Sequence, residues 1–130
     1  MTLAIDSTPA AELIKRFGIG PRASIATVLG GTGYFAVTPE APYNGGLSTA
    51  EQTRQLLAKA EARLAQIGSG KDRLAFVAII LADMADYQTM NAVWDDWVKD
   101  VEPPARACFE ARLASPDLKV EMIMVCAAAR

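Results

Sequence analysis

The spacing of apolar residues along the chain predicts five strands and two long helices. Strand-like runs lie at about 23–38 (a hairpin), 74–81, 104–113 and 118–128, whereas helical spacing is found at 48–67 and at about 86–99. The resulting order is ββαβαββ, which predicts an α+β fold with one mixed sheet packed against two helices. The apolar stripes of the helices consist of Leu57, Ala60, Leu64 and Ile67 in the first and Tyr87, Met90, Trp94, Trp97 and Val98 in the second.

Local signals set the ends of these elements. Ser48-Thr49-Ala50-Glu51 is a capping box that predicts a helix start, and Gly68 predicts its end. Residues 39–47 hold two prolines and two glycines, which is typical of a loop. A short helix is possible over 9–17, before Gly18, Gly20 and Pro21 break any continuation.

Two glycine-rich segments have structural explanations. Gly30-Gly31-Thr32-Gly33 lies between two strand-like runs, so a hairpin turn explains it better than a phosphate-binding loop. The segment 68–71 (GSGK) resembles half a P-loop, but position 65 is Ala and Asp72 stands where Ser or Thr is needed. It therefore indicates a helix C-cap followed by a loop.

Composition narrows the class of protein. The 130 residues fit one domain, with 1–20 as a variable N-terminal extension. The net charge is −2 without a basic run, which argues against nucleic-acid and anionic-membrane partners. The longest apolar runs, 74–82 and 122–129, are too short to span a bilayer, and no secretory signal is visible. Two cysteines form no disulfide framework, so a cytoplasmic location is expected.

The chain contains no histidine. This excludes Ser-His-Asp and Cys-His catalysis, and two cysteines cannot complete the usual zinc site. No metal or other cofactor is therefore expected. Acid–base chemistry would fall to carboxylates, Lys, Tyr, Cys or bound water.

Arg106 is the first candidate for a functional residue. It follows the pair Pro103-Pro104 in a segment expected to be a buried strand, where it shares one face with Cys108, Glu110 and Arg112. A guanidinium group is costly to bury without an anion, and it can hold a carboxylate through two parallel hydrogen bonds. Two interpretations are open, namely an ion pair with a neighbouring Asp or Glu and a site for a small carboxylate-bearing ligand.

Asn91 is the second unusual residue, because it falls within the apolar stripe of its helix, between Tyr87 and Trp94. A buried amide needs partners, so it either ties the helix to a neighbouring segment or lines a ligand cleft. Trp94 and Trp97 are expected to be core or subunit-interface residues. The polar side of the same helix, with Asp95, Asp96, Lys99 and Asp100, is expected to be solvated.

Several short segments together resemble the RidA (YjgF) family of reactive-intermediate deaminases, over roughly residues 20–128. They are Glu51-Gln52-Thr53, Leu81-Ala82-Asp83, Met90-Asn91-Ala92-Val93-Trp94, Pro104-Ala105-Arg106-Ala107-Cys108 and Lys119-Val120-Glu121. The Pro-Ala-Arg-x-Cys segment with the later Val-Glu is the specific part of this resemblance.

The resemblance implies a chorismate-mutase-like fold and a homotrimer with clefts between subunits. It also implies hydrolysis of enamines and imines such as 2-aminoacrylate to 2-keto acids and ammonia. In that scheme Arg106 binds the substrate carboxylate, Glu121 positions or polarises the water, and Cys108 lines the pocket. Asn91 would have a structural role or would support the substrate-binding groups.

Two positions depart from the pattern of this family. Arg22 follows Gly20-Pro21 where the deaminases have Tyr, and Ala36-Val37 stands near the end of a strand where they have Ser. Arg22 could add positive charge to the cleft or be an ordinary surface residue. Three functions are therefore considered: an enamine/imine deaminase, either general or dedicated to one catabolic pathway; a non-catalytic binder of keto acids; and a ribonuclease or translation inhibitor. The acidic balance and the lack of histidine count against the third.

Overall fold

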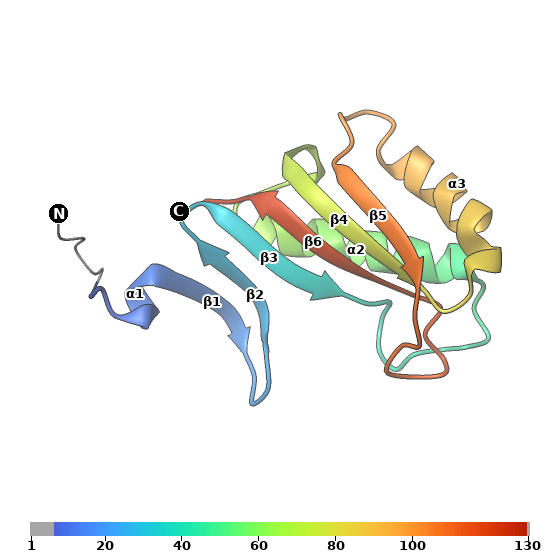
Figure 1. Cartoon of the computed structure of the whole chain (residues 1–130), viewed down its shortest axis with the longest axis horizontal. Coiled ribbons are helices and arrows are strands. Elements are labelled where there is room, and N and C mark those ends of the chain that lie inside the picture. Colours follow the sequence, from blue (N-terminus) through green and yellow to red (C-terminus); the bar gives the residue numbers. More distant parts are fainter. Residues whose placement is uncertain (1–6, 130) are drawn as a thin grey trace, which may run out of the picture.

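The computed structural model describes residues 7–129, which form a mixed sheet with two long helices on one face (Figure 1). Within these residues the sheet has six strands in the order β1-β2-β3-β6-β4-β5, and only the β4–β5 pair is parallel. The elements are α1 (Ala10–Leu13), β1 (Ile14–Ile19), β2 (Ser24–Leu29), β3 (Thr32–Val37), α2 (Thr49–Gln66), β4 (Leu74–Leu81), α3 (Tyr87–Trp97), β5 (Ala105–Glu110) and β6 (Val120–Ala127), with 3-10 turns η1 (Lys71–Arg73) and η2 (Met84–Asp86).

The predicted α+β class and the single mixed sheet with two covering helices are confirmed. The capping box is present, since Ser48 Oγ accepts a hydrogen bond from the Glu51 amide at 3.1 Å and the Glu51 carboxylate accepts one from the Ser48 amide at 3.3 Å. Gly68 follows α2 with φ +71°, a conformation that favours glycine. Gly30 and Gly31 both have positive φ in the β2–β3 hairpin, as a tight turn between twisted strands requires.

The N-terminal segment differs from the prediction. The helix expected over 9–17 is limited to α1, and the chain then enters β1, which pairs antiparallel with β2 from Ile14↔Leu29 to Ile19↔Ser24. Local spacing could not indicate this strand, because β1 is an edge strand whose only partner among the described strands is β2. Residues 1–6 of the expected N-terminal extension lie outside the described residues.

The predicted burial of the strand that carries Arg106 is also wrong for the single chain. β5 is an edge strand that pairs only with β4 among the described strands, and Phe109 is 47% exposed. The strand is also shorter than predicted, because it ends at Glu110.

Alternation along the inner strands gives the sheet two different faces. On β6, Val120, Met122, Met124 and Cys126 are buried with α2 and α3, whereas Glu121 and Ile123 point to the opposite face. We call this opposite side the open face, because no helix of residues 7–129 covers it (Figure 1). Large apolar side chains are exposed there: Ile25, Leu29, Tyr34, Phe76, Phe109 and Ile123.

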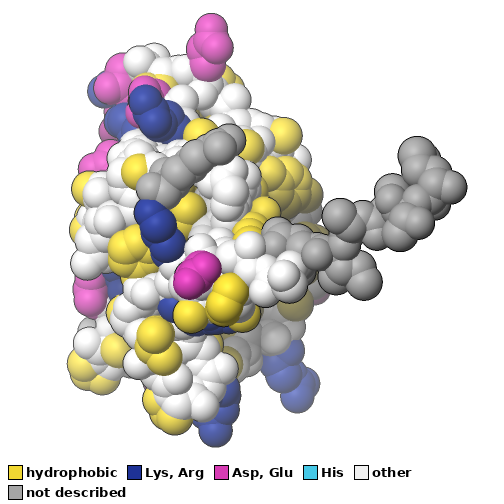
Figure 2. All heavy atoms as spheres, turned by 90° about the vertical axis from the view of Figure 1, so that its left-hand side faces the viewer, with side chains coloured by type: hydrophobic (Ala, Val, Ile, Leu, Met, Phe, Trp, Pro, Cys, Tyr) yellow, Lys and Arg dark blue, Asp and Glu magenta, His cyan; other side chains and the backbone are white. Residues whose placement is uncertain are grey.

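Exposed apolar groups also occur at the β1–β2 end of the molecule. Figure 2 shows hydrophobic side chains in several separate groups on this side, with basic side chains between them. Leu13 and Ile19 are among the exposed large hydrophobic residues of this region. None of the helices in residues 7–129 has the length and apolar character that crossing a bilayer requires.

A buried glutamine fastens two loops to α2. Gln52 is 1% exposed, and its Nε2 donates hydrogen bonds to the carbonyls of Asn44 at 3.1 Å and Asp117 at 2.8 Å. Its Oε1 accepts from the Lys119 amide at 2.9 Å. The amide group thus satisfies backbone groups of both loops and fixes the chain just before Glu121.

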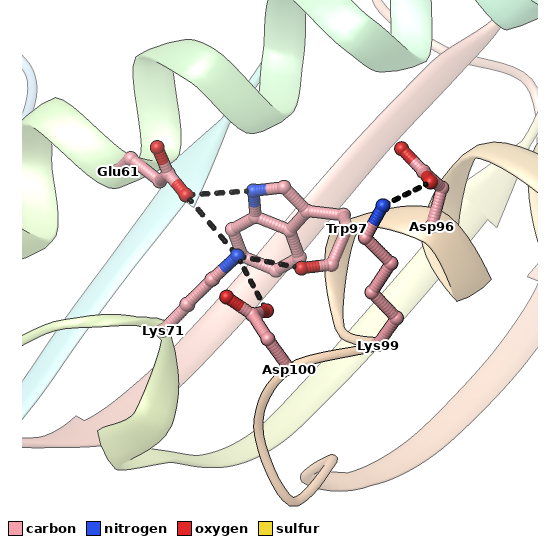
Figure 3. Close-up of polar contacts among 6 residues, drawn as sticks. All are labelled: Glu61, Lys71, Asp96, Trp97, Lys99 and Asp100. Atoms are coloured by element: carbon pink, nitrogen blue, oxygen red, sulfur yellow. Dashed lines mark hydrogen bonds and ion pairs between the residues drawn. The ribbon is translucent and has the colours of Figure 1, made fainter.

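A second polar cluster joins α2 and the turn η1 to the end of α3 (Figure 3). Lys71 donates to the Trp97 carbonyl at 2.8 Å and forms an ion pair with Asp100 at 3.0 Å, while Trp97 Nε1 donates to Glu61 at 3.0 Å. Asp96 and Lys99 pair at 3.0 Å on the exposed side of the same region. The side chains at 95, 96, 99 and 100 are all exposed, as predicted.

We expect Gln52→Leu to lower the free energy of unfolding by about 3 kcal/mol, because it leaves buried carbonyl and amide groups of two loops unpaired. Urea unfolding followed by circular dichroism measures this change. Gln66→Leu, at an exposed position of the same helix, is the control and should change stability by no more than about 0.5 kcal/mol. Equal effects of the two substitutions would contradict the role assigned to Gln52.

Candidate active site

Arg106 lies on β5 with its side chain on the helix-covered face. It is opposite Val77 of β4, which is fully buried under the helices. Its Nη2 donates a hydrogen bond to Tyr87 Oη at 3.3 Å. The guanidinium carbon lies 5.9 Å from the centre of the Tyr87 ring and 5.6 Å from that of Trp94. The half-buried cation is therefore held by α3.

No ion pair is formed by Arg106 with any carboxylate of residues 7–129. The interpretation of this residue as half of a strand ion pair is therefore wrong for the described chain. A guanidinium group has five N–H donors, and the Tyr87 contact uses one. A pair of parallel donors remains available for an anion at the sheet edge.

Cys108 is the neighbour of Arg106 on the same face of β5, opposite Ile79. Burial raises the pKa of its thiol above the usual value, and the positive charge of Arg106 opposes that shift only partly. The thiol form therefore dominates at neutral pH, which suits a pocket wall better than a nucleophile.

Glu121 does not meet Arg106 within one chain. It lies on β6 opposite Ile80, and its side chain is on the open face, whereas Arg106 is on the helix-covered face. Strand β4 also separates β6 from β5, and neighbouring strands are about 4.8 Å apart. Burial raises the pKa of the Glu121 carboxyl above its usual range.

Asn91 lies on α3 between Tyr87 and Trp94, and its Oδ1 is buried without a hydrogen-bond partner among residues 7–129. The amide oxygen therefore does not tie α3 to a neighbouring strand in the single chain. Buried acceptors are seldom left unpaired, so this position has capacity for a further donor.

Arg22 and Ala36 occupy places remote from Arg106. Arg22 is exposed in the turn between β1 and β2, closed by a hydrogen bond from the Gly20 amide to the Ala23 carbonyl, and this hairpin lies at the opposite sheet edge from β5 (Figure 1). Ala36 of β3 pairs with Ile123 on the open face, the face that also carries Glu121. The candidate residues thus form two groups on opposite faces.

Two hollows in the surface of residues 7–129 lie away from these groups. Hollows of about 460 Å³ between α2 and α3 and about 600 Å³ beside residues 110–116 are lined by neither Arg106, Cys108 nor Glu121. Within residues 7–129 we find no grouping of three or more Cys, Asp or Glu side chains that could hold a metal ion.

Sequence reasoning placed Tyr87 and Trp94 in the apolar stripe of α3 but missed their contact with Arg106. The signal was the hydroxyl of a tyrosine within a mostly apolar stripe, since a half-buried hydroxyl usually has a polar partner. Which residue supplies that partner depends on the packing of α3 beside β5, which the pattern of either element alone does not contain.

Several known proteins are similar to this chain in architecture and in sequence. The protein-family model described as Endoribonuclease L-PSP matches residues 24–128 of the chain. A solved structure of a YjgF-family member from Neisseria meningitidis is 40% identical and superposes with a TM-score of 0.81, covering 90% of this chain and 96% of that one. A RutC family protein of Haemophilus ducreyi is 36% identical over 115 residues, which are 88% of this chain and 97% of that protein.

One relative has a named activity. The 3-aminoacrylate deaminase RutC of Acinetobacter baylyi is 34% identical over 76 residues, which cover 58% of this chain and 60% of that protein. The family model matches most of the chain, and the relatives from Haemophilus ducreyi and Neisseria meningitidis are similar along nearly their whole length. The chain belongs to the YjgF/RutC family.

Proposed function

We propose that this protein is a hydrolytic deaminase of small enamines and imines that carry a carboxylate, of the 2-aminoacrylate type. The observation that carries the proposal is the half-buried guanidinium of Arg106, which has no carboxylate partner in the described chain and retains a free pair of donors. The activity named for the Acinetobacter relative, deamination of 3-aminoacrylate, is of the same chemical class.

The site we propose is shared between copies of the chain. Its two charged groups, Arg106 and Glu121, lie on opposite faces of one sheet, so a ligand could contact both only if they come from different copies. The exposed apolar side chains of the open face, among them Tyr34, Phe76 and Ile123, favour burial against another copy. The homotrimer implied by the family resemblance supplies such an arrangement.

In this scheme Arg106 holds the substrate carboxylate through two parallel hydrogen bonds. An enamine first takes a proton on carbon and becomes an iminium ion, and water then adds to the carbon of the C=N bond. Glu121 of another copy orients this water and accepts its proton. The nitrogen takes up a proton, the C–N bond breaks as the hydroxyl gives its proton to solvent and becomes the carbonyl, and ammonia leaves.

This reaction needs little from the protein beyond orientation and charge complementarity. An iminium carbon is already electrophilic, so placing water and neutralising the carboxylate lowers much of the barrier. The absence of histidine is therefore compatible with the chemistry. Cys108 forms a wall of the pocket, and Arg22 of another copy is available to add a second positive charge to it.

We expect the wild-type protein to accelerate the loss of 2-aminoacrylate generated from serine by a pyridoxal-phosphate dehydratase, with keto acid formed. Arg106→Ala should lower kcat/KM by about 100-fold or more, because a charge-assisted bidentate contact is lost. Arg54→Ala, which removes an exposed arginine of α2, is the matched control and should leave the rate unchanged.

If Arg106→Ala accelerates the loss of 2-aminoacrylate as much as the wild-type protein does, the assignment of Arg106 as the carboxylate site is overturned. A thermal shift with 2-ketobutyrate but no turnover would replace the deaminase by a binder of keto acids. A salt-sensitive, Arg106-dependent cleavage of RNA would instead favour the ribonuclease.

The raised pKa of Glu121 gives a prediction of opposite effects on activity and stability. If its carboxylate orients water, kcat/KM should fall as the pH drops through a pKa above that of an ordinary Glu. Glu121→Gln should be nearly inactive, and its residual activity should not show this fall at low pH.

The pKa of Glu121 is higher in the folded state than in the unfolded state, so its ionised carboxylate destabilises the fold at pH values above the folded-state pKa. This destabilisation vanishes at pH values below the unfolded-state pKa. Glu121→Gln should therefore melt at a higher temperature than wild type at pH 7–8, with the difference shrinking as the pH falls. Glu102→Gln, at an exposed position, is the control. A Glu121→Gln variant that is less stable than wild type at pH 8 would contradict this account.

A further inference from the structure

Arg106 is framed on two sides by aromatic rings of one helix. Tyr87 and Trp94 are seven residues apart, which places them two turns apart on the same side of α3, with a rise of about 10 Å between them. The guanidinium carbon of Arg106 lies 5.9 Å from the Tyr87 ring centre and 5.6 Å from the Trp94 ring centre. We propose that Tyr87 and Trp94 are positioning residues that clamp the Arg106 guanidinium in the orientation that binds the substrate carboxylate.

The Trp94 ring is fixed by the surrounding structure. Trp94 is 4% exposed and packs against Trp97, with ring centres 5.5 Å apart. Trp97 is itself held, because its Nε1 donates to Glu61 and Lys71 bonds to its carbonyl (Figure 3). The orientation of Arg106 is thus linked through two tryptophans to the packing of α3 against α2.

The chemical nature of the clamp matters for binding. A carboxylate in the place of Tyr87 would hold Arg106 equally well, but it would neutralise the cation and compete with an anionic ligand. The phenol oxygen accepts only one N–H, at 3.3 Å, and the rings attract the cation through their faces. Arg106 is therefore held by neutral groups and keeps its full positive charge.

The clamp also reduces the entropic cost of binding. A free arginine side chain samples many rotamers, and part of that conformational freedom would otherwise be lost when a carboxylate binds. A guanidinium that is already fixed in plane loses less. Since the carboxylate contact is present in both the ground state and the transition state, loosening the clamp should raise KM and leave kcat nearly unchanged.

This inference rests on the proposed function for its kinetic readout, and a second readout is independent of it. We would measure kcat, KM, 2-ketobutyrate affinity by calorimetry, and rotation of the Arg106 guanidinium by nitrogen-15 NMR of its side chain. The variants are Tyr87→Phe, Trp94→Leu and Trp94→Phe. Tyr43→Phe is the matched control, because it removes a phenol that hydrogen bonds to Thr38 Oγ1 at 3.2 Å elsewhere.

We expect Tyr87→Phe to raise KM and the dissociation constant about 3-fold to 10-fold, as for loss of one ordinary hydrogen bond. Trp94→Leu should have a larger effect, and Trp94→Phe should restore much of the affinity because it retains a ring. Guanidinium rotation should be slow in wild type and in Tyr43→Phe, and faster in Tyr87→Phe and Trp94→Leu.

The clamp is refuted if the guanidinium rotates freely in folded wild-type protein, or if rotation and keto acid affinity are the same in Tyr87→Phe and Trp94→Leu as in Tyr43→Phe. Failure of wild type to hydrolyse 2-aminoacrylate, with slow rotation that Tyr87→Phe abolishes, would overturn the deaminase and support the clamp. Lower thermal stability of Trp94→Leu with unchanged KM would show a structural role alone.

Discussion

The strict alternation of side chains between the two faces of the sheet is the constraint on which the rest of this structure depends. α2 and α3 bury one face, so the residues in register with Val77 and Met124 lie beneath helices, and their neighbours along each strand face the other way. Arg106 and Glu121 are fixed on opposite sides by this register, and a one-residue slip of β5 or β6 would exchange the faces.

The position of β5 at the sheet edge explains how a charged residue is tolerated beneath a helix. Arg106 places its guanidinium near the rings of Tyr87 and Trp94, and the residue as a whole is only partly buried at the edge. On the other face, the Glu121 carboxyl is partly desolvated by its neighbours and its pKa is raised. The charge of Glu121 is less favourable for the isolated chain than an ordinary surface charge would be, a pattern that is common where residues serve binding or catalysis.

Those features of the fold that depend on neighbours in sequence could be predicted from the sequence. The capping box at Ser48, the positive-φ glycine after α2 and the buried strand β4 follow from local spacing and backbone preference. β1 could not be predicted, because the spacing of Ile14 and Phe17 also suits a helix and only pairing with β2 decides between them.

The candidate site, like the fold, has some features that are set by neighbouring residues in the sequence and others that are set by tertiary packing. The segment around Arg106 and the later Glu121 could be identified from residue types and family resemblance. Their separation onto two faces, however, depends on the intervening strand β4, which pairs with both β5 and β6. The aromatic contacts of Arg106 likewise come from tertiary packing between α3 and β5, which leaves no periodic signal in either segment.

The most direct test of a site shared between copies is complementation between two inactive variants. Chains carrying Arg106→Ala and Glu121→Gln, with different tags, would be co-expressed, and assemblies that contain both would be purified through the two tags. If each site takes Arg106 from one copy and Glu121 from the next, every cyclic trimer that contains both variants should hold about one intact site in three, and the doubly purified mixture should regain about a third of wild-type activity. Mixed assemblies, verified by native mass spectrometry, that are no more active than either parent would contradict the shared site.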